Sequence, residues 1–381
     1  MRITIIGAGI GGLTLGIALQ AKGFQVDIFE KSKAFQKIGA GIILGNNAMQ
    51  VYNQLGLTAT LKAKGSKVSS MNVTNASNKL ISGMSLEHFE NKFDSINLAI
   101  HRADLQNSLF EALAPGTVQF SKAVKNVHEN DDSVRIEFED GSSIDSSLVI
   151  AADGVHSVVR NGLFPKVETR DSKQLCWRAV VEHKLSSDFD EIFTEMWGKG
   201  RRVGFGQINE KEVYWFALIN SDKDHPSYHD GTWRKKFSEF IPEVQEILGK
   251  ADPDRMHLSQ MSDFKPIKKW YTNRVCLLGD AAHAMTPNMG QGAGQSIEDA
   301  YRLAQIMTGK EFEDNQHSFD QLFKEYQEYR MPKVKRIVNT SWTIGSIAQL
   351  NNPLLRGFRN NMMRLLPDSL NQKQLESVFT I

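Results

Sequence analysis

Three glycines near the start of the chain have the spacing of a nucleotide-binding turn. The motif Gly7-x-Gly9-x-x-Gly12 directly follows a short β-branched run and opens a helical pattern. In such a turn the first glycine permits a sharp bend, the second lets a pyrophosphate approach the backbone, and the third lets helix and strand pack closely. The free N–H groups and positive dipole end of the helix then face the phosphates. The motif therefore predicts a dinucleotide site.

Glu30, at the end of the next expected strand, supports the same site. Its carboxylate can accept hydrogen bonds from the hydroxyl groups of a ribose, and it would repel a 2′-phosphate. NADP is therefore disfavoured here, whereas FAD and NAD both fit. Lys31 follows Glu30 and is counted among the expected cofactor-binding residues. A structural turn without a ligand is the alternative, since a glycine motif alone is a weak signal.

A second glycine-rich segment lies far along the chain and separates these cofactors. Residues 279–287 read GDAAHAMTP, and residues 290–294 read GQGAG. This arrangement places the acid Asp280 at a strand end and a glycine turn at a helix start. A plain NAD dehydrogenase does not need such a segment, so the pattern favours FAD.

Three segments together resemble the flavin-dependent aromatic hydroxylase family, the group A monooxygenases with the para-hydroxybenzoate hydroxylase fold. They are residues 7–12 with Glu30, residues 153–160 (DGVHSVVR) and residues 279–287, in this order along the chain. The likeness runs from residue 1 to about residue 336. Relatives in this family include salicylate, 3-hydroxybenzoate and urate hydroxylases and tetracycline-inactivating monooxygenases.

The resemblance implies roles for individual residues around FAD. Asp280 would contact the ribityl and pyrophosphate part, with Arg102 beside the same region. Asp153 would lie near both FAD and an approaching nicotinamide, although a capped turn after a strand is an equal alternative. Lys37 stands where some relatives have arginine, which keeps the charge without the bidentate geometry. The residues expected against the isoalloxazine are Pro287, Gly290, Gln291 and Gly292.

His283, inside the second segment, could serve as a base, but its position in the motif favours a structural hydrogen bond. Three further side chains are expected to face the substrate. Arg178 and Arg202 lie on expected neighbouring strands and could point inward, and Tyr214 could donate a phenolic hydrogen bond. Surface charge and core packing are the alternatives. No side chain is assigned a catalytic role, because the chemistry in this family is centred on the flavin.

The resemblance implies a single-component FAD monooxygenase. NADH or NADPH would reduce FAD as a transient donor, since the chain has no second GxGxxG motif. Oxygen would form a flavin C4a-hydroperoxide that hydroxylates a small aromatic or anionic substrate. An olefin epoxidase, a tetracycline-type hydroxylase, a flavin oxidase or dehydrogenase without oxygen insertion, and a non-catalytic nucleotide-binding scaffold remain open.

The elements that position these residues predict an α/β protein. Strands over residues 3–6 and 25–29 with a helix between them form a βαβ unit, and strands without alternating helices fill residues 170–270. We therefore expect a discontinuous Rossmann-like FAD-binding domain, an inserted β-sheet substrate layer and a helical C-terminal tail with breaks at Pro332 and Pro353. The expected segments are 1–168 and 271–311 for FAD, 169–270 for the substrate layer and 312–381 for the tail. Four tryptophans are expected in the core of that layer, with an aromatic pocket as the alternative: Trp177, Trp197, Trp215 and Trp233.

Composition narrows the class of protein. Of 381 residues, 41% are hydrophobic and 23% charged, which is typical of a globular chain. The net charge of +1 offers no field to recruit a nucleic acid. Cys176 and Cys276 show neither metal-site nor disulfide spacing, which fits the reducing cytoplasm and a protein without a metal site. We expect a monomer or a homodimer. The uncharged stretch 3–21 imitates a signal peptide or a membrane span, but its glycines argue against both.

Overall fold

The computed structural model describes residues 2–35, 40–220, 231–308 and 316–381. The chain forms two compact units, and each is made of separate stretches of sequence. The first unit comprises Met1–Gln36, Leu105–Arg170 and Asp263–Ser341; the second comprises Lys37–Asp104, Asp171–Ser262 and Trp342–Ile381. This division differs from the expected segment 1–168, because strand β5 (Ser70–Asn75) pairs with strand β14 (Ile192–Trp197) in the sheet of the second unit.

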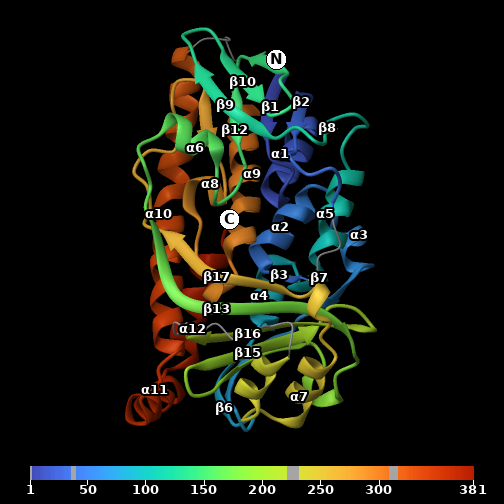
Figure 1. Ribbon diagram of the computed structural model, residues 1–381, viewed down its shortest axis with the longest axis vertical. Coiled ribbons are helices and arrows are strands. Elements are labelled where there is room, and N and C mark those ends of the chain that lie inside the picture. Colours follow the sequence, from blue (N-terminus) through green and yellow to red (C-terminus); the bar gives the residue numbers. More distant parts are fainter. Residues whose placement is uncertain (1, 36–39, 221–230, 309–315) are drawn as a thin grey trace. The chain divides into compact units, whose positions relative to one another are not determined.

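A parallel five-stranded sheet forms the centre of the first unit, in the order β18-β12-β1-β2-β8. Four of these strands, β12, β1, β2 and β8, are labelled in Figure 1. Strand β1 (Arg2–Ile6), helix α1 (Ile10–Gln20) and strand β2 (Gln25–Phe29) make the expected βαβ unit. The uncharged stretch is therefore a strand and a helix, and no helix among the described residues is long and apolar enough to cross a membrane. The remaining strands of this sheet are β8 (Val118–Gln119), β12 (Val149–Ala151) and β18 (Val275–Leu277).

Helix α9 (Gly292–Thr308) packs against α1, and the approach is close. A Cβ atom on Gly11 would lie 2.8 Å from a methyl group of Leu278 and 3.1 Å from Cβ of Ser296 on α9. A small antiparallel sheet and further helices complete the unit: β9 (Val124–Glu129), β10 (Val134–Phe138), β11 (Ser143–Ser146), α5 (Arg102–Glu111) from Leu105 on, α6 (Val158–Leu163), α8 (Asp280–His283) and the first part of α10 (Gln316–Ala348).

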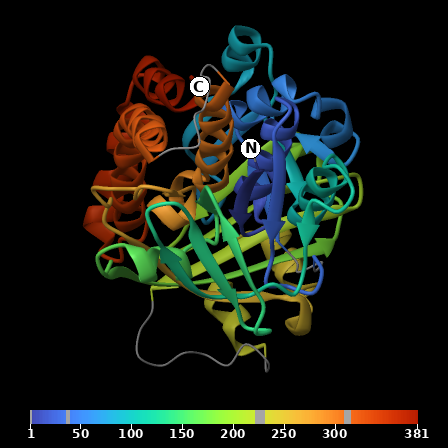
Figure 2. The ribbon, with the colours of Figure 1, turned by 90° about the horizontal axis from the view of Figure 1, so that it is seen from above.

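The break expected at Pro332 is wrong, because α10 continues through this residue. An internal proline costs about 3 kcal/mol through its missing N–H group and its steric clash. Buried side chains on both sides of it, including Tyr326 and Val334, together with the buried Arg330, hold the helix and offset that cost. The break at Pro353 is confirmed, because this residue begins helix α11 (Pro353–Leu365). The helices α10 to α12 are orange to red in Figure 2.

A mixed seven-stranded sheet forms the second unit, in the order β17-β13-β16-β15-β14-β5-β6. Four neighbouring pairs are antiparallel, namely β13 with β16, β16 with β15, β15 with β14 and β5 with β6, whereas β14 and β5 pair in parallel. The sequence analysis expected strands here but did not include β5 and β6, which lie far upstream. Besides β5 and β14, the strands of this sheet are β6 (Leu80–Ser85), β13 (Thr169–Glu182), β15 (Arg201–Gln207), β16 (Glu212–Asn220) and β17 (His257–Phe264).

One face of this sheet carries an aromatic core. The Trp233 ring stacks between those of Trp177 and Trp215, with centroid distances of 5.4 Å and 5.8 Å. All three side chains are fully buried, so the core interpretation is confirmed for them. Trp197 is also buried, but it lies outside this cluster and its ring contacts Arg359. The short helix η2 (Thr232–Phe237) supplies Trp233, and α7 (Pro242–Gly249) adds apolar side chains to the same core.

The other elements of the second unit are a three-stranded sheet and short helices. They are β3 (Gly41–Leu44), β4 (Gly65–Lys67), β7 (Leu98–His101), α2 (Asn46–Gln54), α3 (Thr58–Lys62), α4 (Glu87–Phe93) and α12 (Asp368–Phe379). The C-terminal end of α12 is fixed on α2 and α4. Gln50 Nε2 donates to the carbonyl of Phe379 at 2.8 Å, and the Phe379 ring lies 5.2 Å from that of Phe89.

Candidate active site

The carboxyl ends of four parallel strands meet at one edge of the first unit's sheet. Strand β1 lies between β2 and β12, and β18 lies beside β12. Ligands of open α/β sheets bind at this edge, where the strand order reverses. Residues 7–12 follow β1, Glu30 follows β2, residues 153–160 follow β12 and residues 279–287 follow β18. The sheet therefore brings together motif segments that are far apart in the sequence.

The glycine turn after β1 leaves room where a phosphate would approach. A Cβ atom on Gly12 would lie 2.0 Å from the carbonyl oxygen of Gly7, and Gly7 itself has a φ of +100°. By contrast, a Cβ atom on Gly9 would meet no atom within 4 Å. Gly9 is also the N-cap of α1 and places no side chain over the first N–H groups of that helix. The turn therefore fits a pyrophosphate.

The Glu30 carboxylate is held in place by the backbone on both sides. Its Oε2 accepts a hydrogen bond from the Ala8 N–H and its Oε1 accepts one from the Ser32 N–H, each at 2.9 Å. Each carboxylate oxygen can accept a second hydrogen bond, so the oriented group suits a ribose diol. The adjacent Lys31 side chain is exposed.

The segment after β18 presents a carboxylate at the start of the long helix α9. Gly279 has a φ of +61°, and a Cβ atom there would lie 2.5 Å from Ser296 Oγ, so the bend requires glycine. The next residue, Asp280, is exposed, and its Oδ1 is 3.9 Å from the position a Cβ atom would take on Gly292, the first residue of α9. Of the other expected flavin contacts, Pro287 and Gly290 are exposed, Gly292 is partly exposed, and Gln291 is buried.

Asp153 caps a turn and also keeps one oxygen atom unused. Its Oδ2 accepts a hydrogen bond from the Val159 N–H at 3.2 Å. Its Oδ1 is buried and has no hydrogen-bond partner among the residues that the structure describes. Burial raises the pKa of this carboxyl group, although hydrogen bonds from Ser157 and the backbone oppose the rise. The capped turn is therefore present, and the free oxygen leaves the proposed contact with FAD or nicotinamide open.

Arg160, which the sequence analysis did not single out, ties two of the motif segments together. Its guanidinium donates to the carbonyl of Ala281 at 3.0 Å and to that of Val155 at 2.7 Å. It also lies 4.7 Å from the centre of the Phe264 ring. Its place as the last residue of the DGVHSVVR segment is the sequence signal that could have identified this role.

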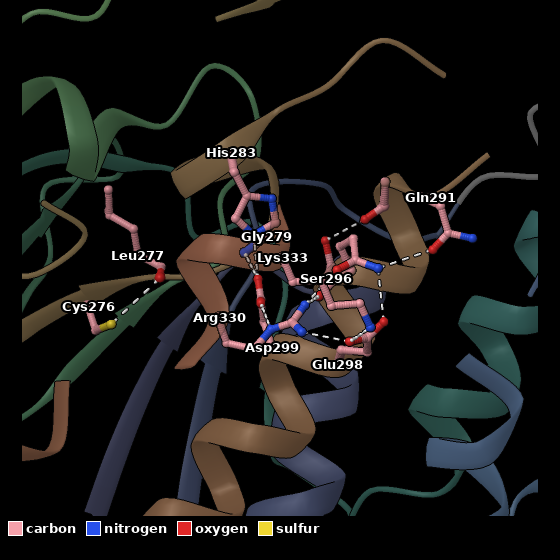
Figure 3. A network of polar contacts seen from close by, with 12 residues as sticks. Cys276, Leu277, Gly279, His283, Gln291, Ser296, Glu298, Asp299, Arg330 and Lys333 are labelled. Carbon is pink, nitrogen blue, oxygen red and sulfur yellow. Dashed lines mark hydrogen bonds and ion pairs between the residues drawn. The ribbon is translucent and has the colours of Figure 1, made fainter. Parts of the chain in front are cut away.

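A buried network beneath the Gly279–Asp280 bend holds the bend in place (Figure 3). The Asp299 Oδ2 atom accepts a hydrogen bond from the Gly279 N–H at 3.1 Å and lies 2.5 Å from His283 Nε2. The expected structural hydrogen bond of His283 is therefore confirmed. Burial alone would raise the pKa of Asp299, but His283 and Arg330 outweigh it and hold that pKa well below its usual range.

The same network joins α9 to α10 through Arg330. This side chain donates from Nε to Asp299 at 2.7 Å and from Nη1 to Glu298 at 2.6 Å. Lys333 Nζ also contacts Glu298, at 2.7 Å. The buried carboxylates of Glu298 and Asp299 thus face the cations of Arg330 and Lys333. The adjacent acids Glu298 and Asp299, set between the apolar residues Ile297 and Ala300, were the available sequence signal.

In the second unit, the sheet face opposite the tryptophan core carries the expected substrate residues. Arg178 on β13, Phe216 on β16 and Gly204 on β15 are directly opposite one another across the strands and share this face. The Phe216 ring lies 6.4 Å from the Tyr214 ring. A Cβ atom on Gly204 would lie 2.3 Å from the Phe216 ring, so the missing side chain lets the aromatic ring cover the sheet.

Arg178 is held on this face by neutral groups. Its Nη2 donates to Ser259 Oγ at 3.1 Å, and its Nε lies 3.4 Å from Cys176 Sγ. Within the described part of the chain it has no carboxylate partner. Burial raises the pKa of Tyr214 to about 12, so its phenol stays protonated at neutral pH.

His257, the exposed first residue of β17, is a further titratable group in the second unit that was not expected from the sequence. Burial, together with the positive charges of Arg178 and Arg102, lowers its pKa. The alternation of apolar Met256 and Leu258 with His257 and Ser259 was a signal that could have placed it on the polar side of the strand.

Arg202 differs from Arg178 in its surroundings. The expectation that the two lie on neighbouring strands is wrong, because β16 separates β13 from β15. Arg202 is 1% exposed, and it donates to Glu195 at 3.0 Å and to Gln174 at 3.2 Å. Its charge is therefore compensated inside the protein.

Arg102 is exposed at the start of α5 and belongs to the second unit. Its backbone N–H donates to Ala40 at 2.9 Å, and its guanidinium has no hydrogen bond or ion pair among the described residues. Lys37 lies outside the described residues. The flavin contacts of both stay predictions.

Substituting two glycines of the turn should separate folding from cofactor binding. We expect Gly12→Ala to prevent folding of the first unit, because its Cβ atom would overlap the Gly7 carbonyl. Gly9→Ala should fold normally and bind FAD at least tenfold more weakly, since its methyl group occupies the space next to the α1 N-terminus. Circular dichroism and flavin titration measure the two effects. Normal FAD affinity in Gly9→Ala would contradict the assignment of the turn.

Removing the buried Asp299 carboxylate should destabilise the protein. Asp299→Ala removes the buried carboxylate that Arg330 Nε, His283 and the Gly279 N–H all contact, at a cost of about 3–5 kcal/mol at pH 7. Because the folded-state pKa of Asp299 is depressed, its contribution is complete above the unfolded value of about 3.9 and is lost as the pH falls below it. Urea titrations should therefore show a stability gap between wild type and variant that narrows below about pH 4. Asp299→Asn, which keeps the shape of the side chain but loses its charge, is the control. If Asp299→Ala and wild type were equally stable at pH 7, the stabilising role of the Asp299 carboxylate would be contradicted.

Comparisons with known proteins agree with this site. The family model described as the FAD binding domain matches residues 1–341. The chain is 30% identical over 370 residues to aurachin C monooxygenase/isomerase of Stigmatella aurantiaca, covering 96% of this chain and 94% of that protein. It is 29% identical over 386 residues to 2-heptyl-3-hydroxy-4(1H)-quinolone synthase of Pseudomonas aeruginosa, covering 100% and 98%.

A solved structure supports the same conclusion. HpxO of Klebsiella pneumoniae, complexed with FAD and uric acid, superposes with a TM-score of 0.89 at 25% identity, covering 100% of this chain and 96% of that one. The match spans the FAD sheet, the mixed sheet and the C-terminal helices, so the expected fold class is confirmed. The chain belongs to the FAD binding domain family of flavoproteins and is an FAD-dependent monooxygenase of the hydroxylase type.

Proposed function

We propose that the protein uses NADH or NADPH and O2 to hydroxylate a planar nitrogen heteroaromatic compound whose ring carries an oxo or enolate oxygen as a substituent. The observation that carries this proposal is Arg178, a cation without a carboxylate partner among the described residues, set beside Phe216 and Tyr214 on one sheet face. An enolate or oxo group on a flat ring would supply the missing negative charge. A quinolone and uric acid, which appear in the names of two relatives, are rings of this kind.

The residues of the first unit fit FAD at several points. The open turn at Gly9 and the α1 N-terminus would hold the pyrophosphate, and Glu30 would hold the ribose. Asp280 would accept hydrogen bonds from the ribityl hydroxyls, as its exposure beside Gly292 allows. When bound, FAD supplies the electron transfer and the activation of oxygen that the protein itself cannot.

Two helix ends would then stabilise negative charge on the cofactor. Helix α9 is 17 residues long, and its first residues are the expected neighbours of the isoalloxazine. Its N-terminal N–H groups are fixed in direction, so they stabilise an anion without reorganisation. The network around Asp299 holds the preceding bend, and with it the direction in which these groups point.

In the second unit, the protein's contribution is to orient the substrate. The Phe216 ring would lie against the plane of the substrate, and Arg178 would donate hydrogen bonds to the oxo or enolate oxygen of the substrate. Tyr214 keeps its proton at neutral pH and can donate a second hydrogen bond. Arg202 takes no part in this proposal, because Glu195 compensates its charge.

A labelled-oxygen experiment tests the reaction. We expect one atom from 18O2 in the product when the FAD-loaded protein is incubated with NADH or NADPH and a panel containing a 4-quinolone, urate, a hydroxybenzoate and an unsubstituted quinoline. The oxygen-bearing heterocycles should also accelerate consumption of the nicotinamide. Consumption that yields only hydrogen peroxide, with no labelled product across the panel, would favour a flavin oxidase instead.

Replacing Arg178 should weaken substrate binding without affecting FAD. Arg178→Met removes the cation but keeps much of the side-chain volume, and we expect the dissociation constant of the best substrate to rise about 30-fold or more. Arg135→Met on β10, where the arginine pairs with Asp145 in an exposed position, is the matched control and should change nothing. Titration of substrate into both variants, with FAD content measured alongside, decides the point. Unchanged affinity in Arg178→Met would remove this residue from the substrate site.

A further inference from the structure

Helix α11 presents large apolar side chains to solvent. Leu354 is 82% exposed, Phe358 68% and Leu365 77%. Leu355 and Met362 on the same helix are exposed as well. A contiguous group of this kind is unusual on the surface of a monomeric protein and marks an interaction site.

These side chains form one stripe along the helix. Leu354, Phe358, Met362 and Leu365 follow one another at intervals of four and three residues, which places them on a single helix face. Leu355 lies at the edge of that face. The arrangement is amphipathic, but the apolar side faces solvent.

The orientation of α11 is fixed by a buried arginine on another side of the helix. Arg359 is 5% exposed, and its Nη1 donates to the carbonyls of Ile347 and Ala348, at 3.1 Å and 2.9 Å, in the last turn of α10. Its guanidinium also lies 4.6 Å from the centre of the Trp197 ring. A cation at the carbonyl end of a helix is favourable. The polar anchor therefore faces the second unit, and the apolar stripe faces outward.

The charges on α11 all have one sign. The helix contains Arg356, Arg359 and Arg364 and no aspartate or glutamate. Arg364 is exposed and Arg356 partly so, and by helical spacing both lie outside the stripe, on different sides of the helix. Long arginine side chains can reach past an apolar face to anionic groups at its border.

The apolar surface extends beyond α11 within the second unit. Leu80, at the start of β6, is 52% exposed, and its carbonyl accepts a hydrogen bond from Arg364 Nε at 3.2 Å. Ile347 and Leu370, near the two ends of α11 in the sequence, are also exposed. We call the stripe together with these three residues the α11 surface.

We propose that the α11 surface docks the protein on an anionic lipid bilayer, with the helix lying in the plane of the headgroups. An apolar stripe on a helix whose only charged residues are arginines has the composition of such interfacial helices. A second copy of the chain fits less well, because pairing two such helices would bring their arginines together with no acid on α11 to offset them. Lipid phosphates supply that charge. The proposal rests on this surface alone and does not depend on the proposed substrate.

Vesicle flotation with the FAD-loaded protein tests the docking. We expect wild type to float with vesicles of 70% phosphatidylcholine and 30% phosphatidylglycerol, to bind pure phosphatidylcholine far more weakly, and to be released in part by 0.5 M salt. The variant Leu354→Ser/Phe358→Ser/Leu365→Ser should lose at least tenfold in binding to the anionic vesicles, since each side chain buries apolar area in the interface. Arg364→Gln should lose about fivefold.

A matched pair of single substitutions controls for the general loss of surface apolarity. Met362 on α11 and Tyr329 on α10 are each 47% exposed. Met362→Ser should weaken binding to anionic vesicles, and Tyr329→Ser should not. The substituted positions are exposed, and the contacts that are lost, between Tyr329 and Arg302 and between Arg364 and Leu80, lie at the surface. All variants should therefore keep the FAD content of wild type and a melting temperature close to it. Absence of wild-type flotation, or flotation of the triple variant equal to wild type, would overturn the proposal. So would a dimer in sedimentation velocity that the triple substitution abolishes, because it would make a second copy the occupant.

Discussion

The buried Asp299 carboxylate is the interaction on which the cofactor site depends. It accepts hydrogen bonds from the backbone of Gly279 and from Arg330, and it lies against His283. These three contacts come from the bend after β18, from helix α8 and from helix α10, so one side chain sets their relative positions. A buried charge of this kind is costly unless its partners are complete. Loss of any one contact would leave the buried Asp299 carboxylate poorly compensated. The contact between Asp299 and the Gly279 N–H therefore keeps the bend that presents Asp280 rigid.

The second unit obtains its site from the alternation of side chains along its strands. Trp177 and Trp215 face one way into a packed aromatic core, so their neighbours Arg178, Tyr214 and Phe216 must face the other way. A stable core on one side of the sheet thus fixes the register of the functional groups on the other. A slip of one residue would exchange the two sets and lose both.

Much of the first unit could be predicted from the sequence, because its signals are local. The glycine turn, the β-branched strands and Glu30 are close together in the chain, and the structure has them as expected. The resemblance to a family supplied the fold of the rest. The pairings between strands far apart in the sequence were not predictable. Strand β5 pairs with β14 more than a hundred residues away, and the residues of neither strand indicate which strand it pairs with. The same holds for Arg330 and Asp299, and for the separation of Arg178 from Arg202 by β16. At Pro332 a correct local rule failed, because tertiary packing outweighed the cost of one proline.

The tryptophan stack has an optical consequence. Three indoles lie nearly parallel, with interplanar angles of 13° and 15° between neighbours, at separations where their electronic transitions couple. Such coupling splits the absorption band into a pair of circular-dichroism signals of opposite sign, and it exists only while the three rings remain stacked. All three belong to the second unit, whereas the expected flavin contacts in the described chain lie mainly in the first. The FAD-loaded protein thus has two separate spectroscopic signals. The ultraviolet circular dichroism of the tryptophan stack reports on unfolding of the second unit, and the visible absorption of the flavin reports mainly on the first.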